Sequence, residues 1–291
     1  MKPYTGRFAP SPTGRLHTGS VLAALGSFLD ARHHDGRWLV RIEDLDTPRV
    51  VPGSAEEILR TLQRLNLFWD GAITYQSARL PLYQARLEQL RDSGRTYECS
   101  CSRQSLAAQG EAGYPGICRA GPRRPGPTAT RFRIRDGETV EFTDRLQGLR
   151  RLRLDALGDV VVRRRDGIFA YQLAVVIDDA EQGISDVVRG ADLLDSTAWQ
   201  IELQRALGCK LPDYAHLPVV TAPGGGKLAK SRCSVPPDLS NPSQVLHQAL
   251  VLLGQQPPVD LATLPPREVL EWAVPNWKPA RLRRLATVAV R

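Results

Sequence analysis

The chain has 291 residues, 42% of them hydrophobic, which is enough to bury a large core in one domain with insertions or in roughly two or three smaller ones. Lysine and arginine outnumber aspartate and glutamate by 39 to 31, and this basic balance of +8 favours a polyanionic partner such as nucleic acid. No signal peptide follows Met1, and no apolar run reaches the roughly 20 residues of a membrane helix. We therefore expect a cytoplasmic protein without a membrane partner.

Residues 1–95 show the order strand, helix, strand, helix, helix, which predicts a parallel α/β sheet. A short strand over 4–10 precedes a helix with apolar residues at helical spacing, which we expect Gly36 to close. The sequence RWLVRIEDLD then alternates as a second strand. Ser54-Ala-Glu-Glu57 has the pattern of a capping box at the start of the next helix, and the last helix is expected to end at Gly94. One face of the second strand is expected to carry Trp38, Val40 and Ile42.

The sequence changes character at residue 96, where cysteine, glycine and proline become frequent and short predicted strands follow. We interpret residues 96–170 as an α+β insertion that divides the core into 1–95 and 171–238. The second half resumes the α/β pattern, and 239–291 is helical in pattern with proline breaks. Arginine clusters between Arg123 and Arg165 are compatible with either a solvated surface or RNA contact.

The stretch RFAPSPTGRLHTGS, residues 7–20, leads directly into the first predicted helix. A helix N-terminus binds phosphate through its free N–H groups, and the His17 imidazole could add a donor there. Gly19 would let a nucleotide lie against the backbone. The alternative is a loop histidine with no role. The fixed backbone path imposed by the loop prolines favours the nucleotide site.

A second basic motif, GGGKLAKS, ends at Ser231 and carries Lys227 and Lys230. Two lysines after a glycine run suit a loop that closes on phosphates. It is not a P-loop, because Leu228 stands where serine or threonine is required. The alternative is an exposed basic turn.

Three acidic residues, Glu43, Asp44 and Asp46, follow the second predicted strand. Ligands bind at the carboxyl ends of parallel strands, so this cluster predicts a binding site. The alternative for Glu43 is a structural ion pair with Arg41.

Three of the five cysteines, Cys99, Cys101 and Cys118, fall within the insertion, where they predict a metal site in a reducing compartment. The residue types leave the fourth ligand open between Glu98, Glu111 and water. The alternative is three free thiols in a loop.

Taken together, PSPTGRLHTGS and KLAKS resemble the two signature motifs of class I aminoacyl-tRNA synthetases. RFAPSPTG, RIEDLD, YQLAVVIDD and VVRGADLLDSTAWQI resemble the catalytic core of glutamyl-tRNA synthetases, up to about residue 240. Two features differ: Ser20 stands where many members have histidine, and the chain stops near 290, before an anticodon-binding domain. This length and the cysteine cluster are similar to the glutamyl-queuosine tRNA(Asp) synthetases, a truncated branch.

The resemblance implies a Rossmann-like parallel-sheet core and an enzyme that activates L-glutamate with ATP and Mg²⁺. It then transfers glutamate to the queuosine base in the anticodon of tRNA(Asp). It also implies one structural Zn²⁺ per chain, with Tyr114 as the fourth ligand beside Cys99, Cys101 and Cys118. The implied glutamate-binding residues are Arg7, Ala9, Ser11, Glu43, Tyr171 and Arg189. The implied ATP-binding residues are His17, Gly19, Ser20, Lys227, Lys230 and Ser231, with His17 and Lys230 catalytic.

Three other functions compete with this hypothesis. A truncated glutamyl-tRNA synthetase would charge a tRNA 3′ end, but without an anticodon domain it would lose discrimination. A non-catalytic RNA-binding paralogue would have no need of the intact His17, Glu43, Arg189 and Lys230 set. A nucleotidylyltransferase unrelated to tRNA would not need the long RFAPSPTG match. We expect the chain to act as a monomer.

Overall fold

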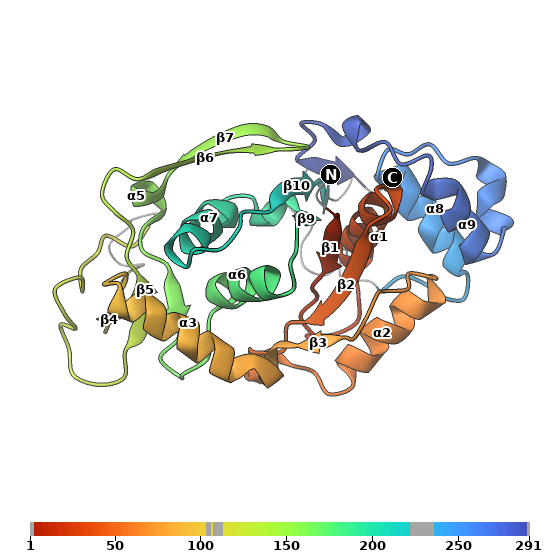
Figure 1. The fold of residues 1–291 in the computed structure, drawn as a ribbon. Helices are drawn as coiled ribbons and strands as arrows, with labels where there is room; N and C mark the ends of the chain where they lie inside the picture. Colours follow the sequence, from red (N-terminus) through yellow and green to blue (C-terminus); the bar gives the residue numbers. More distant parts are fainter. Residues whose placement is uncertain (1–2, 103–105, 107–112, 222–235, 290–291) are drawn as a thin grey trace.

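The computed structural model describes residues 3–102, 106, 113–221 and 236–289. Figure 1 shows a central parallel sheet with helices on both faces, a β-rich region on one side and a helical C-terminal region on the other. The α/β class predicted from the sequence is confirmed. Within the described part of the chain, no helix combines the length and apolarity needed to cross a lipid bilayer.

The core consists of two sheets that lie side by side: β1, β2 and β3 form one, and β6, β10 and β9 form the parallel part of the other. β1 pairs with β2, β2 with β3, β9 with β10 and β10 with β6, all in parallel. The two halves meet where the Ser185 N–H donates to the Thr5 carbonyl at 2.9 Å and the Thr5 N–H donates to Ser185 Oγ at 2.8 Å. These strands are β1 (Thr5–Phe8), β2 (Arg37–Ile42), β3 (Thr74–Tyr75), β6 (Thr139–Asp144), β9 (Asp186–Gly190) and β10 (Asp213–Leu217).

Helices on the two faces of the sheet enclose two large hydrophobic cores. α1, α2, α8 and α9 cover one face, and α3, α6 and α7 cover the other. Both faces of β2 are therefore buried: Trp38, Val40 and Ile42 enter the first core and Leu39 the second. The helices are α1 (Thr18–His33), α2 (Ser54–Arg64), α3 (Leu80–Asp92), α6 (Tyr171–Glu181), α7 (Ser196–Ala206), α8 (Pro242–Leu252) and α9 (Pro266–Ala273).

Two predicted helix ends differ from the structure. α2 begins at Ser54 but has Gly53 as its N-cap, and no side chain caps it, so the capping box is wrong. The Ser54 hydroxyl instead accepts from the Gly14 N–H at 3.0 Å and donates to the Gly14 carbonyl at 2.7 Å. After α1, Asp35 takes the left-handed conformation (φ +51°) rather than Gly36. Gly36 is needed because a Cβ there would lie 2.7 Å from the Cβ of Tyr4.

Residues between α3 and α6 form a small antiparallel sheet and a hairpin. β5 pairs with β4 on one side and with β8 on the other. The β6–β7 hairpin reaches back to the core, where Asp144 pairs with Tyr214 of β10. The additional elements are β4 (Thr96–Cys99), β5 (Ala129–Phe132), β7 (Gly148–Arg153), α5 (Leu154–Leu157) and β8 (Val161–Arg163).

The C-terminal region is tied to the core through Asp30 of α1. The Trp277 indole N–H donates to Asp30 at 3.0 Å, the Tyr4 hydroxyl donates to it at 2.5 Å, and Arg145 forms an ion pair with it. β12 (Thr287–Ala289) pairs in parallel with β11 (Val219–Thr221), and Leu246 of α8 lies in the first core. The C-terminal helices thus share one apolar interior with α1.

Candidate functional site

A cavity of about 800 Å³ opens beside the carboxyl end of β2 and the N-terminus of α6. Ser11, Glu43 and Tyr171 line one end of it, and Cys101 and Arg131 line the other. The cavity therefore joins the expected glutamate site to the cysteine-rich insertion. This placement agrees with the prediction that ligands bind where the parallel strands end.

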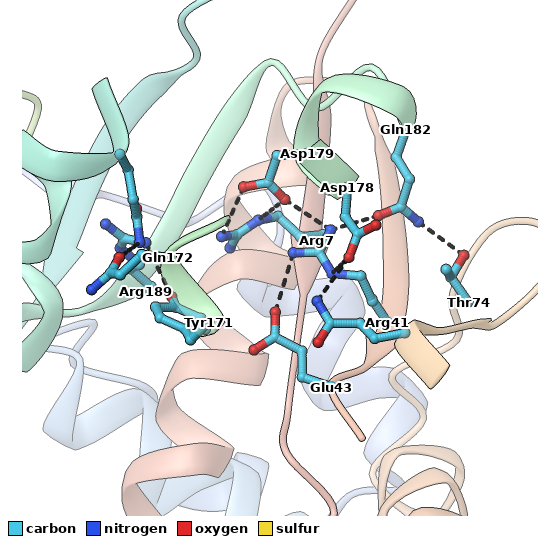
Figure 2. A network of polar contacts seen from close by, with 12 residues as sticks. Arg7, Arg41, Glu43, Thr74, Tyr171, Gln172, Asp178, Asp179, Gln182 and Arg189 are labelled. Carbon is cyan, nitrogen blue, oxygen red and sulfur yellow. Dashed lines mark hydrogen bonds and ion pairs between the residues drawn. The ribbon is translucent and has the colours of Figure 1, made fainter. Parts of the chain in front are cut away.

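A buried ion-pair network holds the floor of this site (Figure 2). Arg7 of β1 forms a bidentate ion pair with Asp179 of α6, in which Nε donates to Oδ1 at 3.1 Å and Nη2 donates to Oδ2 at 3.3 Å. Arg41 contacts the same Asp179 carboxylate at 2.8 Å and Glu43 at 3.3 Å. The Arg41–Glu43 ion pair, the alternative interpretation of Glu43, is thus present, and Glu43 nevertheless lines the cavity.

Glu43 is poised to change its charge near neutral pH. Burial raises its pKa to about 7, although Arg41 and Arg7 act in the opposite direction. Desolvation disfavours the carboxylate, so a cation placed beside it would shift the equilibrium toward the charged form. An ammonium group entering the cavity is such a cation.

Arg189 of β9 and Tyr171 of α6 form a second group beside this network (Figure 2). Arg189 donates from Nη1 to the Tyr171 hydroxyl at 3.3 Å, from Nη2 to Thr197 at 2.8 Å, and from Nε to His216 at 3.0 Å. Arg189 is buried, and all of these acceptors are uncharged oxygen or nitrogen atoms. Sequence reasoning did not identify Thr197 or His216, because nothing local in the sequence connects them to Arg189.

The loop after β1 brings the remaining described residues of the first motif to the start of α1. His17 is the N-cap of α1: its Nδ1 accepts from the Ser20 N–H at 3.2 Å, and the Ser20 hydroxyl lies 3.1 Å from Nε2. Partial desolvation lowers the pKa of His17, which favours the neutral ring. Because Nδ1 accepts from the Ser20 N–H, the neutral ring carries its proton on Nε2. A Cβ at Gly19 would lie 3.1 Å from this ring, which explains the glycine.

The other residues expected to bind ligand are either partly exposed near the cavity or outside the described part of the chain. Ala9 is half-buried, and Ser11 is exposed on the cavity wall. Lys227, Lys230 and Ser231 of the second motif lie outside the described residues. Their expected role in ATP binding stays a prediction.

The three cysteines between α3 and α6 come together as a group that could hold a metal ion. The Sγ atoms of Cys99, Cys101 and Cys118 all lie within 4.8 Å of one another. The Tyr114 hydroxyl lies 3.3 Å from Cys99 Sγ and 3.7 Å from Cys101 Sγ. Tetrahedral zinc with bonds of about 2.3 Å needs sulfur atoms about 3.8 Å apart, so this cluster fits the ion.

The other candidates for a fourth ligand are less suitable. Both carboxylate oxygens of Glu98 accept from threonine hydroxyls, Thr128 at 2.5 Å and Thr130 at 2.9 Å. Glu111 lies outside the described residues. The Arg131 guanidinium stacks 3.6 Å from the centre of the Tyr114 ring and also lines the cavity. Arg131 thus connects the sulfur cluster to the cavity wall.

Comparison with known proteins agrees with this geometry. Residues 4–271 match the family model of the catalytic domain of class I tRNA synthetases (E and Q). A protein of Aromatoleum aromaticum named glutamyl-Q tRNA(Asp) synthetase is 51% identical, covering 94% of this chain and 89% of the relative. One from Pseudomonas aeruginosa with the same name is also 51% identical, with coverage of 98% and 97%.

Solved structures of glutamate-tRNA synthetases share this fold at lower sequence identity. The glutamate-tRNA synthetase of Elizabethkingia anophelis superposes with a TM-score of 0.84 at 26% identity, covering 100% of this chain and 68% of the other. A glutamate tRNA ligase from Elizabethkingia meningosepticum, in complex with its amino acid, gives 0.83 at 26% identity, with coverage of 99% and 67%. The chain therefore belongs to the class I tRNA synthetases of the E and Q type and, within them, to the glutamyl-Q tRNA(Asp) synthetases.

Proposed function

We propose that the protein activates L-glutamate with ATP and transfers the glutamyl group to the queuosine base in the anticodon of tRNA(Asp). One observation carries the proposal: Glu43 and Tyr171 line one cavity, and two buried arginines from distant parts of the chain lie directly behind them. Arg189 donates to the Tyr171 hydroxyl, and Arg7 shares the Asp179 carboxylate with Arg41, the ion-pair partner of Glu43. Glutamate has two carboxylates and one ammonium. The site offers two arginines, one acid and one hydroxyl to match them.

Each group of the amino acid has a partner in this arrangement. Glu43 would hold the ammonium, and Arg189 with its neighbour Tyr171 would bind one carboxylate. Arg7 would face the other carboxylate, held in place by Asp179. Ala9 and Ser11 would add backbone and hydroxyl contacts. Burial strengthens these polar contacts, because little water competes for them.

Activation would join an α-carboxylate oxygen of glutamate to the α-phosphorus of ATP, while the bond from that phosphorus to the bridging oxygen breaks and pyrophosphate leaves. His17 Nε2–H and the N–H groups at the start of α1 would donate to the phosphate oxygens as charge develops on them. Gly19 and Ser20 would lie against the nucleotide, and Lys227, Lys230 and Ser231 would complete the phosphate site. Mg²⁺ bound to ATP would neutralise charge on the triphosphate.

Transfer would follow when a hydroxyl of queuosine attacks the activated carbonyl and AMP leaves. The cavity wall carries Arg49, Arg131, Arg164 and Arg165, whose positive charge suits an RNA backbone. Cys99, Cys101, Tyr114 and Cys118 would hold one structural Zn²⁺ next to this wall. We place the activity in the cytoplasm, on a monomer built from segments 1–95, 96–170, 171–238 and 239–291.

Labelled glutamate tests the proposal. The protein is incubated with ATP, labelled glutamate and either queuosine-containing tRNA(Asp) or tRNA(Glu), and nuclease digestion then locates the label. We expect label on the anticodon nucleotide of tRNA(Asp), and none on tRNA(Asp) that carries guanine in place of queuosine. Label on the 3′ adenosine of tRNA(Glu) would instead mean a charging enzyme. Absence of label on every tRNA would refute the transfer step.

A further inference from the structure

We propose that Asp144 and His216 form a positioning pair that fixes the imidazole tautomer and so holds Arg189 toward the glutamate pocket. This inference rests on the function proposed above, since it assigns Arg189 to glutamate. Neither residue contacts the cavity itself. Both act through hydrogen bonds that end on the guanidinium.

The Asp144 carboxylate at the end of β6 can present only acceptors to its neighbours. Its Oδ1 accepts from the backbone N–H groups of Leu146 at 2.9 Å, Gln147 at 2.8 Å and His216 at 3.2 Å. Its Oδ2 lies 2.6 Å from His216 Nδ1. The two oxygens therefore have different partners: Oδ1 accepts from backbone N–H groups, and Oδ2 faces the imidazole.

The tautomer of His216 follows from what surrounds it. An arginine Nε always carries a proton, so Arg189 Nε, 3.0 Å from His216 Nε2, must donate to a lone pair there. The ring proton must then lie on Nδ1, where it is donated to Asp144. His216 is completely buried, and burial together with the Arg189 charge lowers its pKa although Asp144 acts in the opposite direction, which favours the neutral ring. The Thr197 hydroxyl also lies 3.2 Å from Nε2, but it accepts from Arg189 Nη2 at 2.8 Å and donates to the Leu193 carbonyl at 3.3 Å. One neutral tautomer therefore agrees with all of these contacts.

A neutral hydrogen-bond acceptor can orient a substrate-binding arginine without compensating its positive charge. Arg7 and Arg41 are held by carboxylates, which compensate their charge. Arg189 forms no ion pair among the described residues. Its Nε is fixed by an imidazole and its Nη2 by the Thr197 hydroxyl, while Nη1 points to Tyr171. The guanidinium is therefore oriented without losing positive charge, which leaves that charge for a carboxylate of the ligand.

The substitution Asp144→Asn tests the tautomer with almost no change in shape. The three backbone N–H donors require the amide oxygen of the new side chain at the Oδ1 position. Its NH₂ group must then face His216 Nδ1, so the imidazole proton moves to Nε2. There it opposes the N–H of Arg189 Nε. The arginine should turn away although every side chain except one is unchanged.

Glutamate-dependent ATP–pyrophosphate exchange is the first readout. We expect D144N to raise the KM for glutamate by about 10- to 100-fold, as for loss of a well-placed charged hydrogen bond, and to leave the KM for ATP within about twofold. Asp186→Asn is the matched control, because Asp186 is a buried carboxylate on β9, in the same sheet, that accepts from the Ser185 hydroxyl and does not contact His216. D186N should keep the wild-type KM for glutamate. An unchanged glutamate KM in D144N would overturn the proposal.

The second readout is independent of activity and of how well D144N folds. In wild-type protein labelled with ¹⁵N-histidine, NMR should show His216 protonated at Nδ1 and not at Nε2, with the resonances assigned by their loss in H216Q. A proton on Nε2 in the wild type would overturn the proposal.

In an R189K background, which lacks the Nε donor, D144N should change the glutamate KM by less than about twofold; a full effect there would also overturn it. Failure of the proposed function looks different: the wild type itself would show no glutamate-dependent exchange.

Discussion

Glutamate binding should depend on pH through the carboxyl group of Glu43. Only the ionised form of Glu43 can pair with the glutamate ammonium, and burial raises the pKa of this group to about 7 in the free protein. Lowering the pH from 8 to 6 should therefore weaken glutamate binding. The raised pKa fixes the direction of the change in affinity, because protonation at lower pH converts the Glu43 carboxylate into a neutral group that cannot attract the ammonium.

The size of the effect follows from the same value. With a pKa near 7, about ten of every eleven molecules have Glu43 ionised at pH 8, and about one of eleven at pH 6. The KM for glutamate should thus be about tenfold higher at pH 6 than at pH 8. If the pKa of Glu43 were at its ordinary value near 4.5, the change over this range would be a few per cent.

Initial rates of ATP–pyrophosphate exchange at saturating ATP, from pH 5.5 to 8.5, measure this dependence. Glu43→Gln should bind glutamate weakly and remove the dependence on pH. Asp44→Asn is the matched control, because Asp44 is engaged by Ser77 and does not line the cavity. It should keep the wild-type profile. A flat wild-type profile, or the same slope in E43Q, would refute the assignment of Glu43 to the ammonium.

Three further results are expected. Purified protein should contain about one zinc per chain by elemental analysis, lost in Cys101→Ser and kept in Cys209→Ser; a metal-free wild type would rule out the site. Lys230→Ala should reduce exchange by about 100-fold or more and Lys210→Ala, at an exposed lysine that does not line the cavity, should not, and near-normal exchange in K230A would remove Lys230 from the mechanism. Ser54→Ala should lower the free energy of unfolding in urea by about 1–3 kcal/mol, because two polar atoms of Gly14 lose their partner; no change in the midpoint would contradict that.

The order of elements in the core was predictable because periodic apolar residues fix it. β7 (Gly148–Arg153) was not predicted, since its arginine-rich sequence has no buried face and its strand forms only by pairing with β6. The capping box failed for a related reason. The Ser54 hydroxyl has a better partner in Gly14, which lies 40 positions away in the sequence, and local pattern rules do not include such partners.

In the candidate site, too, residues within distinctive local motifs were predictable from the sequence, and their long-range partners were not. Family resemblance supplied Arg7 and Arg189, whose neighbourhood in the sequence is distinctive. It did not identify the groups that hold them. Asp179 ends the YQLAVVIDD motif, but it lies 172 positions from Arg7, and Asp144 lies 72 positions from His216. Buried carboxylates and imidazoles acquire partners only when the sheet is assembled. Their roles are therefore a property of the fold.

The tie between Trp277 and Asp30 has a consequence for how the chain unfolds and for how it can be engineered. Cutting at residue 238 would leave the Asp30 carboxylate with Tyr4 and Arg145 as its side-chain partners among the described residues, and it would uncover the side of α1 against which Leu246 packs. The final helices are thus part of the same cooperative unit as the catalytic sheet. A chimaera that exchanges this segment for that of a relative would therefore need to carry over the indole and its apolar neighbours to keep this hydrogen bond and this packing.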